Sequence, residues 1–305
     1  MDQKLAVIDI GTNTINILVA SKNSNGFHTE FFDRIPAKLG KGGMEEGILT
    51  DEAMQRGLEA LSTHRDSCKL HGVHQVKVTA TSAVRSASNG QDFVKKVKEK
   101  LNLEIEIIDG DREADLIWKG VRLTGLLDQE RGLIMDIGGG STEFILADAN
   151  QVYWKKSYDL GVTRLAERFK APDPFTEQAE KQMMSDLKTD MQEVWEALAR
   201  YPTQRLIGAS GSFNSLSMIL AEGRIEELHP IHESIDMHSY VSLSEKLRRS
   251  LFQERESILG LVPDRVDTIP YSVLLIDTML KNSDLNKMLR SSYALKEGLM
   301  GEMME

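Results

Sequence analysis

Only one of the 305 residues is a cysteine, Cys68, so the chain can form no disulfide bridge of its own. That usage is typical of a protein from a reducing compartment. The chain has no apolar run approaching the ~18 residues of a membrane span and no basic-then-apolar leader at its start. These absences lead us to expect a cytoplasmic protein that does not act in a membrane.

Positive charge is also scarce, since the formal net charge is −10 at pH 7. Such a chain does not bind nucleic acid or another polyanion by general surface attraction, so any anion site must be a local cluster of donors. The apolar fraction of 41% and the charged fraction of 28% exclude disordered and fibrous classes. A globular chain of this length is long enough for two domains.

Two stretches of the sequence share one form. "KLAVIDIGTNTINILVA" (4–20) and "RGLIMDIGGGSTEFILA" (131–147) each contain an apolar run, Asp-Ile-Gly, several small or glycine residues and a second apolar run. Their aspartates, Asp9 and Asp136, are 127 residues apart (136 minus 9), far beyond the period of a solenoid repeat. We therefore expect two copies of one structural unit, each opening with a β-hairpin.

The pattern after each copy predicts helices alternating with strands, and so a partly parallel sheet covered by helices. In the first half, Thr50 is the expected N-cap of a helix that stops at Gly72, followed by a strand, a helix, a strand and a helix. In the second half we expect helices over about 176–200, 212–222, 240–259, 268–282 and 294–304, and strands at 204–210 and near 287–292. No low-complexity linker separates the halves. We place the domains at 1–125 and 126–305 with a cleft between them, and the last helix, within 294–305, as a candidate to pack back onto the first domain.

The turn of each hairpin has the composition of a phosphate-binding loop. Consecutive backbone N–H groups in a tight turn form a concave anion site, and glycines let phosphate oxygens approach it. The first loop holds Gly11, Thr12, Asn13 and Thr14, and the second holds Gly138, Gly139, Gly140, Ser141 and Thr142. The alternative is an ordinary hairpin turn whose aspartate satisfies the turn backbone, but two such loops in one frame favour phosphate binding.

Asp9 and Asp136 each end the strand that precedes a loop. A carboxylate beside a phosphate is repulsive unless a cation lies between them, and Mg²⁺, often held through water, is the expected one. A third small-residue loop, "IGASGSFNSL" (207–216), offers Gly208, Ser210, Gly211 and Ser212 to the same anion. The alternative reading of that loop is a simple helix N-cap by Ser212.

These motifs together resemble the actin–hexokinase–Hsp70 superfamily and, within it, the exopolyphosphatase/guanosine pentaphosphate phosphatase family. The narrower resemblance rests on "AVIDIGTNT", "TATSAVRSASNG", "IEIIDGDREADLIWKGV" and "IMDIGGGSTEFIL", supported by "GLVPDRVDTIP" and "ALKEGLM" near the end. It implies an α/β fold of two ribonuclease H-like (actin-like ATPase) domains related by duplication, with an interdomain cleft. The chain resembles the short form of the family, in which polyphosphate is the usual substrate.

The resemblance also implies roles for particular residues. Glu113 would be the catalytic base that polarises the attacking water, Arg85 would grip the terminal phosphate, and Glu143 would lie near metal and water. Asp9 and Asp136 would be the metal-associated carboxylates, the glycine loops would hold phosphate, and Arg265 would be a further phosphate ligand. From the residues alone, the acids of "DREA" equally suit a helix N-terminus, where negative charge is stabilising.

The resemblance predicts a Mg²⁺-dependent (or other divalent cation-dependent) hydrolase that releases orthophosphate from the end of inorganic polyphosphate. Guanosine pentaphosphate is the alternative substrate, because it ends in the same phosphoanhydride. A homodimer is a further expectation that stays open. Two other classes remain: a nucleotide-dependent kinase of the superfamily, and a sensor that binds polyphosphate or an alarmone without turnover. A long polyphosphate also needs a row of basic side chains, or track, beyond the cleft. The candidates are Lys155, Lys156, Arg164, Arg200, Arg205 and the basic residues of "KLRR" at 246–249.

Overall fold

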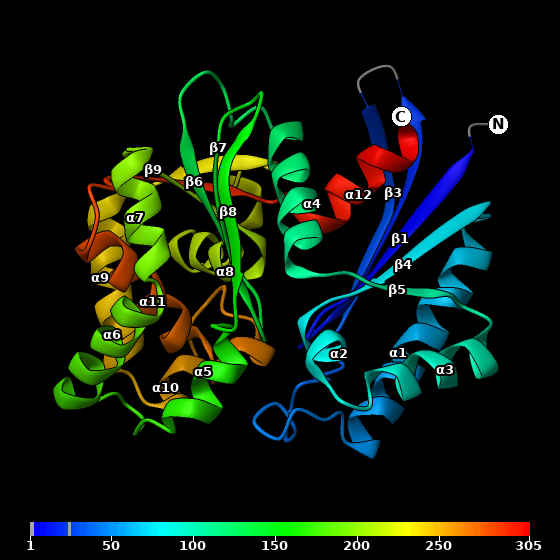
Figure 1. The fold of residues 1–305 in the computed structure, drawn as a ribbon, viewed down its shortest axis with the longest axis horizontal. Helices are drawn as coiled ribbons and strands as arrows, with labels where there is room; N and C mark the ends of the chain where they lie inside the picture. The colour runs from blue at the N-terminus through cyan, green and yellow to red at the C-terminus, as the bar shows by residue number, and fades with distance from the viewer. Residues whose placement is uncertain (1–2, 24–25) are drawn as a thin grey trace.

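Two β-sheets with the same strand order form the framework of the protein, whose computed structural model describes residues 3–23 and 26–305 (Figure 1). The first sheet has the order β3-β2-β1-β4-β5, and the second has the order β8-β7-β6-β9-β11-β10. The strands of the first sheet are β1 (Lys4–Ile10), β2 (Ile15–Asn23), β3 (Gly26–Ile35), β4 (Gln75–Ala80) and β5 (Ile105–Ile107). Those of the second sheet are β6 (Gly132–Ile137), β7 (Thr142–Ala147), β8 (Val152–Tyr158), β9 (Arg205–Ala209), β10 (His232–Ile235) and β11 (Lys287–Ser291). The expected duplication is therefore confirmed.

The two hairpins predicted from the repeated sequence occupy equivalent places in the two sheets. β1 pairs antiparallel with β2 and parallel with β4, and β6 pairs antiparallel with β7 and parallel with β9. The register sets Asp9 opposite Asn16 in the first hairpin and Asp136 opposite Glu143 in the second. The central strands β6 and β7 are buried on both faces because helices cover the sheet on both sides, as is usual where parallel strands lie at the centre.

Helices of the first half pack on the outer face of its sheet. They are α1 (Asp51–Leu70), α2 (Ser82–Ser86) and α3 (Gly90–Leu101). Thr50 caps α1 by accepting a hydrogen bond from the amide of Ala53 at 3.1 Å, and Gly72 follows its end with φ of 66°. Both predicted boundary signals are confirmed.

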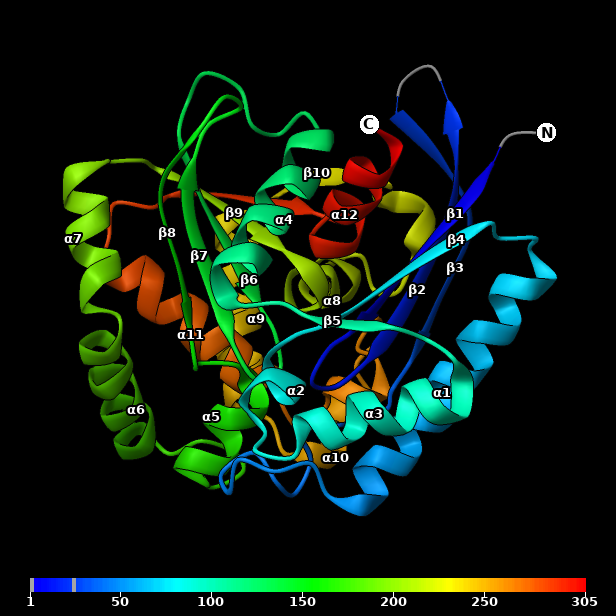
Figure 2. The same cartoon turned by 45° about the vertical axis from the view of Figure 1, so that its right-hand side comes forward.

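Two helices lie between the sheets (Figures 1 and 2). α4 (Gly110–Leu123) and α12 (Leu295–Met304) share one apolar cluster with residues of both sheets, including Val7 and Ile134. The helices approach closely through glycines, since a Cβ on Gly298 would lie 1.9 Å from the carbonyl oxygen of Leu116. The C-terminal helix also contacts β1, β2 and β3 of the first sheet. The boundary between the domains at 125/126 stays a prediction.

The second half is the more helical one, as expected, but two of its helices are shorter than the sequence pattern indicated. The remaining helices are α5 (Val162–Phe169), α6 (Glu177–Asp190), α7 (Gln192–Arg200), α8 (Ser210–Leu220), α9 (Met237–Arg249), α10 (Phe252–Glu256) and α11 (Ile269–Lys281), with 3₁₀ turns η1 (Ile225–Glu227) and η2 (Pro263–Arg265). The segment 176–200 divides at Met191, which leaves helical geometry as its side chain becomes fully buried. The segment 240–259 divides where Ser250 becomes extended, and α9 begins earlier because Asp236 caps it.

Three strands and two helices were absent from the sequence prediction, and one of those helices, α2, carries Arg85. β3, β8 and β10 lie at sheet edges, where one side of the strand has no partner and the apolar–polar alternation is weak. The short α5 follows the second hairpin. Among the residues that the structure describes, no helix combines the length and the apolarity that crossing a membrane requires.

Candidate active site

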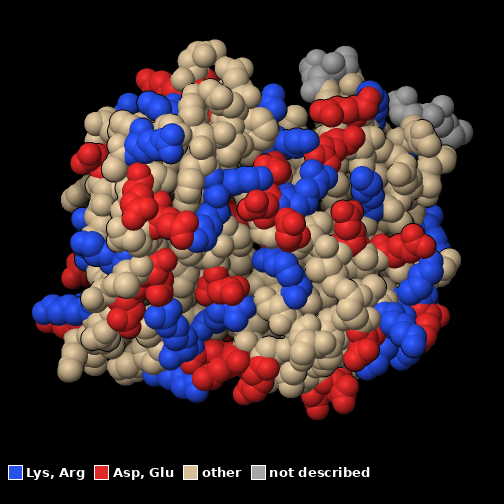
Figure 3. Space-filling view, in the orientation of Figure 1, with Lys and Arg blue, Asp and Glu red and all other residues tan. Residues whose placement is uncertain are grey.

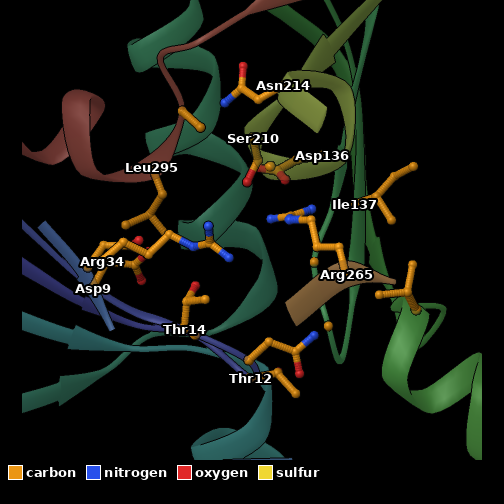
Figure 4. A pocket seen from close by; sticks show the side chains of 18 of the residues that line it. Asp9, Thr12, Thr14, Arg34, Asp136, Ile137, Ser210, Asn214, Arg265 and Leu295 are labelled. Atoms are coloured by element: carbon orange, nitrogen blue, oxygen red, sulfur yellow. The ribbon is translucent and has the colours of Figure 1, made fainter. Parts of the chain in front are cut away.

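A cavity of about 480 Å³ lies between the two halves, and residues of both hairpin turns line it. Figure 4 shows Asp9 and Thr14 on one wall and Asp136 and Ser210 on the opposite wall. Most of the predicted site residues line this cavity: Asp9, Gly11, Thr12, Asn13, Thr14, Glu113, Asp136, Gly138, Gly139, Gly140, Ser141, Glu143, Ser210, Gly211 and Arg265. Segments more than 100 residues apart in the sequence therefore meet around one shared space.

The two hairpin turns have the same internal geometry. The amide of Gly11 donates to the carbonyl of Thr14 at 3.0 Å, and the amide of Gly138 donates to the carbonyl of Ser141 at the same distance. In the second loop the carbonyls of Gly138 and Gly139 accept hydrogen bonds from the first amides of α5. Those carbonyl oxygens therefore point toward α5, so they do not repel an anion in the cavity.

The close approach of the first loop explains why the second loop has glycine at positions 139 and 140. A Cβ on Gly139 would lie 2.8 Å from the Thr12 Cβ, and a Cβ on Gly140 would lie 2.8 Å from the Thr12 Oγ1. Thr163 adds a hydrogen bond from its hydroxyl to the Asn13 amide oxygen at 2.9 Å. The glycines thus let the two loops lie against each other across the cleft.

Four carboxyl groups surround the cavity: Asp136, Glu113 and Glu143 are buried, and Asp9 is partly buried. Burial raises the pKa of Asp9 to about 6 and that of Asp136 to about 7, and each of these two carboxylates raises the pKa of Glu113 in turn. Burial and the neighbouring Glu113 raise the pKa of Glu143 well above its usual range. Carboxyl groups whose pKa values are raised by burial and by neighbouring carboxylates are typical of a functional site.

Glu113 and Arg85 form a partly buried ion pair beside these groups. The Arg85 Nη1 lies 2.8 Å from Glu113 Oε2 and also donates to the carbonyl of Ile108 at 3.0 Å. Burial raises the pKa of Glu113 to about 7, while the guanidinium opposes that rise. Glu113 is only 7% exposed, whereas the neighbouring Asp111 faces solvent. Stabilising the helix N-terminus does not require a buried acid, so Glu113 has a further role.

Cationic side chains also reach the cavity from both halves. Arg265 approaches Ser212 at 3.5 Å, and burial lowers the pKa of its guanidinium to about 10. Lys296, in the first turn of α12, pairs with Glu297 at 2.9 Å. Although burial opposes it, the nearby acids, Glu297, Asp9 and Asp136, raise the pKa of Lys296. An ammonium group thus accompanies the two aspartates.

The donor set fits a divalent cation of the Mg²⁺ type. Asp9 Oδ1 is buried without a hydrogen-bond partner, which leaves a carboxylate oxygen free for a ligand. Across the described ranges 3–23 and 26–305, no three His, Cys, Asp or Glu side chains come together closely enough to chelate a metal ion. Mg²⁺ suits such a place because it keeps several waters and takes only one or two carboxylates besides phosphate oxygens. Asp9 and Asp136 are the residues that would hold it.

Four predicted site residues do not line the cavity but stand directly behind it. Arg85 reaches the site through Glu113. Thr142 donates its hydroxyl to the carbonyl of Leu160 at 2.9 Å, and a Cβ on Gly208 would collide with the ring of Phe213. Ser212 contacts Ser272 at 3.1 Å and makes no cap hydrogen bond, because α8 already begins at Ser210. The simple N-cap reading of that loop is therefore wrong.

The cavity also has lining residues that sequence reasoning missed. The chief ones are Asn16, Arg34, Asn214, Asp264 and Lys296. Asn16 could have been found from the repeat, because it holds the position in the first hairpin that Glu143 holds in the second. Lys296 lies within the "ALKEGLM" motif. Asn214 lies within the third small-residue loop (207–216), whereas Arg34 had no signal, since only the tertiary fold brings it to the cleft.

Most residues suggested for a polyphosphate track are engaged with acidic groups of the chain itself. Arg205 is buried and pairs with Asp128 at 2.8 Å, and Arg248 pairs with Glu180 at 2.8 Å. On the face shown in Figure 3, basic and acidic side chains alternate over the surface. Arg205 and Arg248 are thus structural, and this part of the track prediction is wrong.

Comparison with known proteins agrees with this geometry. The sequence profile of the Ppx/GppA phosphatase family matches residues 18–305. An exopolyphosphatase from Cytophaga hutchinsonii, known by crystal structure, is similar at 34% identity and a TM-score of 0.95, over 99% of this chain and 98% of that one. A Ppx/GppA family member from Aquifex aeolicus shares the fold, with 21% identity and a TM-score of 0.82 over 99% of this chain and 98% of that one.

A longer relative has a different activity. The guanosine-5'-triphosphate,3'-diphosphate pyrophosphatase of Photobacterium profundum is 25% identical over 299 residues, which are 98% of this chain. The match covers 59% of that protein, so the present chain spans little more than half the length of this relative.

Proposed function

This chain belongs to the Ppx/GppA phosphatase family, and from that premise we propose that it is a cytoplasmic exopolyphosphatase dependent on a divalent cation such as Mg²⁺. The reaction adds water to the terminal phosphorus of inorganic polyphosphate, breaks the bridging P–O bond and releases orthophosphate. The observation that carries the proposal is the Arg85–Glu113 pair beside two facing glycine loops in one cavity. The similarity to the exopolyphosphatase of Cytophaga hutchinsonii over both whole chains supports this substrate.

In this proposal Glu113 accepts a proton from the attacking water. Its pKa of about 7 suits a general base at neutral pH, because a base works best when its pKa lies near the operating pH. Arg85 stabilises the ionised carboxylate and fixes its direction. As Glu113 points into the cavity, it can orient water in line with the bridging oxygen.

The backbone amides and hydroxyls of the two loops hold the terminal phosphoryl group, and Ser210, Gly211 and Arg265 approach it from the second half. Asp9 and Asp136 would hold the cation, with Glu143 beside them. A bound divalent cation supplies neutralisation of the charge on phosphate oxygens. Lys296 and Arg265 add positive charge at fixed positions. This charge stabilises the transition state more than the ground state, because negative charge develops there during the reaction.

Guanosine pentaphosphate is the second candidate substrate. The relative from Photobacterium profundum is a guanosine-5'-triphosphate,3'-diphosphate pyrophosphatase. The same cavity is also lined by apolar side chains: Phe32, Met218, Ile225 and Val262. A purine base could be buried against such a surface.

The test is phosphate release with Mg²⁺ from tripolyphosphate, long polyphosphate and guanosine pentaphosphate, using wild type, Glu113→Gln and Asp111→Asn. We expect Glu113→Gln to lower kcat by about 10²–10⁴-fold, as loss of a general base does. Asp111→Asn is the matched control on the same helical turn, and it should keep wild-type activity because Asp111 is exposed.

Each other outcome rejects a specific part of the proposal. Release from guanosine pentaphosphate alone would overturn polyphosphate as the substrate. Binding of polyphosphate without release would indicate the sensor, and transfer from ATP to an added acceptor would indicate the kinase. Equal rates in wild type and Glu113→Gln would remove Glu113 from the chemistry.

A further inference from the structure

Alternate side chains of the edge strand β8 face two different helices. Lys155 and Ser157 are two residues apart, so they lie on the same face of the strand, and both contact α4. Lys156, between them, points the other way and forms an ion pair with Glu193 of α7. The face that carries Lys155 and Ser157 therefore lies against the helix that holds Glu113.

Lys155 fastens the beginning of α4 at two points. Its Nζ donates to the carbonyl of Asp111 at 3.0 Å and pairs with the Asp115 carboxylate at 2.7 Å. Residues four apart lie on one face of a helix, so both contacts are on the same side of α4. Glu113 lies between them in sequence and so points to the opposite side, where Arg85 binds it. The first turns of α4 are thus held from two sides.

Ser157 connects the same strand to the second buried glutamate. Its hydroxyl donates to Glu143 Oε1 at 2.6 Å, and the two residues are direct cross-strand neighbours. The Ser157 side chain also touches the start of α4, because a Cβ on Gly110 would lie 2.5 Å from the Ser157 Cβ. One face of β8 therefore contacts both Glu143 and the start of α4, the helix that holds Glu113.

We propose that Lys155 and Ser157 are positioning residues, which hold Glu113 and Glu143 at a fixed separation across the junction of the two halves. This inference rests on the proposed function of Glu113. Neither residue is among those that line the cavity, so both act through the glutamates rather than on the substrate. Lys155 thereby has a role other than the track suggested by its charge.

The test compares Lys155→Met, Lys155→Arg and Lys95→Met in tripolyphosphate hydrolysis and in amide hydrogen exchange of residues 110–115. We expect Lys155→Met to lower kcat about tenfold, since small displacements of a catalytic group cost up to about 100-fold, while KM stays within about twofold. Exchange at the start of α4 should become faster. Lys155→Arg should keep both quantities near the wild-type values. Lys95→Met, which removes an exposed lysine paired with Glu99 on α3, should change neither.

Ser157→Ala separates the two contacts of that residue. It removes the hydrogen bond to Glu143 but keeps the Cβ that touches Gly110. We expect a kcat about fivefold lower, as for the loss of about 1 kcal/mol of hydrogen bonding, with unchanged exchange in α4.

The proposal is overturned if Lys155→Met leaves both kcat and exchange unchanged, or if it raises KM alone, which would indicate contact with the substrate. Failure of Lys155→Arg to restore exchange would also overturn it. If the wild type does not hydrolyse tripolyphosphate at all, the proposed function fails. The exchange measurement still decides whether Lys155 holds α4.

Discussion

At the scale of single residues, the central feature is a group of acids buried beside fixed positive charges. Asp9 and Asp136 are the penultimate residues of equivalent strands in the two sheets, and Lys296 lies near both on α12. Burial of charge without partners is costly, so this arrangement is poised either to keep protons or to bind a cation.

The raised pKa values of Asp9 and Asp136 make stability depend on pH. Between pH ~4 and 7 the folded state binds more protons than the unfolded state, so protonation stabilises the fold at low pH and this stabilisation is lost as pH rises through about 6–7. For the metal-free protein we expect the melting temperature to fall over this window, measured by scanning calorimetry in EDTA at constant ionic strength.

Adding Mg²⁺ should restore the melting temperature at pH 8 and have little effect at pH 5, because cation binding competes with protons. Asp9→Asn and Asp136→Asn should each weaken this pH dependence. An equal Mg²⁺-induced increase at both pH values would contradict the prediction.

Lys296 gives a second prediction at this scale. Lys296→Met removes a partly buried positive charge beside the cavity, and we expect kcat/KM for tripolyphosphate to fall about 10²-fold, as for loss of a group that stabilises transition-state charge. Lys296→Arg should retain part of the activity. The exposed Lys287→Met serves as control. Activity of Lys296→Met within twofold of wild type would show that this charge does not act in the reaction.

At the scale of secondary-structure elements, the packing of α4 against α12 decides where Glu113 lies. The helices meet at two glycines: a Cβ on Gly120 would lie 2.0 Å from the carbonyl oxygen of Ala294, and one on Gly298 would lie 1.9 Å from that of Leu116. Backbone atoms cannot move aside as a flexible side chain can, so any side chain there separates the helices.

We therefore expect Gly298→Ala to destabilise the protein by about 1–3 kcal/mol, the usual cost of overpacking, and to lower activity as α4 shifts. Thermal unfolding followed by circular dichroism measures the first effect. Gly301→Ala, one turn later on α12, is the matched control, since its Cβ would meet only the Leu123 Cδ1 at 3.3 Å. If Gly298→Ala melts like Gly301→Ala, the close approach is not required.

At the scale of the whole molecule, contacts across the cleft hold the two halves together at the cavity. Arg34 of β3 forms an ion pair with Asp264 of η2, and both line the cavity. Lys170 and Glu45 form a second pair across the halves at 3.2 Å, but there both side chains are exposed. Half-buried pairs are screened less than exposed ones, so the Arg34–Asp264 pair contributes more.

We expect Asp264→Asn to favour an opened cleft and raise KM for tripolyphosphate about fivefold, which corresponds to ~1 kcal/mol. Glu45→Gln, which removes the exposed pair, should change KM less than twofold. Small-angle X-ray scattering should show a larger radius of gyration for Asp264→Asn. An unchanged KM and radius would show that the ion pair does not control closure.

The sequence alone determined the features that depend on local pattern. The repeated Asp-Ile-Gly hairpins predicted the duplication, because strand and turn preferences act over a few residues, and Thr50 and Gly72 marked the ends of α1. The family motifs selected Glu113, Arg85 and the acids that surround the cavity. Edge strands such as β8 escaped prediction, because an exposed strand needs no strong apolar alternation.

Only the tertiary structure decided which charges meet. It buried Arg205 and Arg248 in internal ion pairs, brought Arg34 and Lys296 to the cleft, and set Lys155 against the helix of Glu113. These outcomes join residues that are 40 or more positions apart in the chain. Electrostatic energy depends on separation in space and on burial, and neither quantity is written in the local order of the residues.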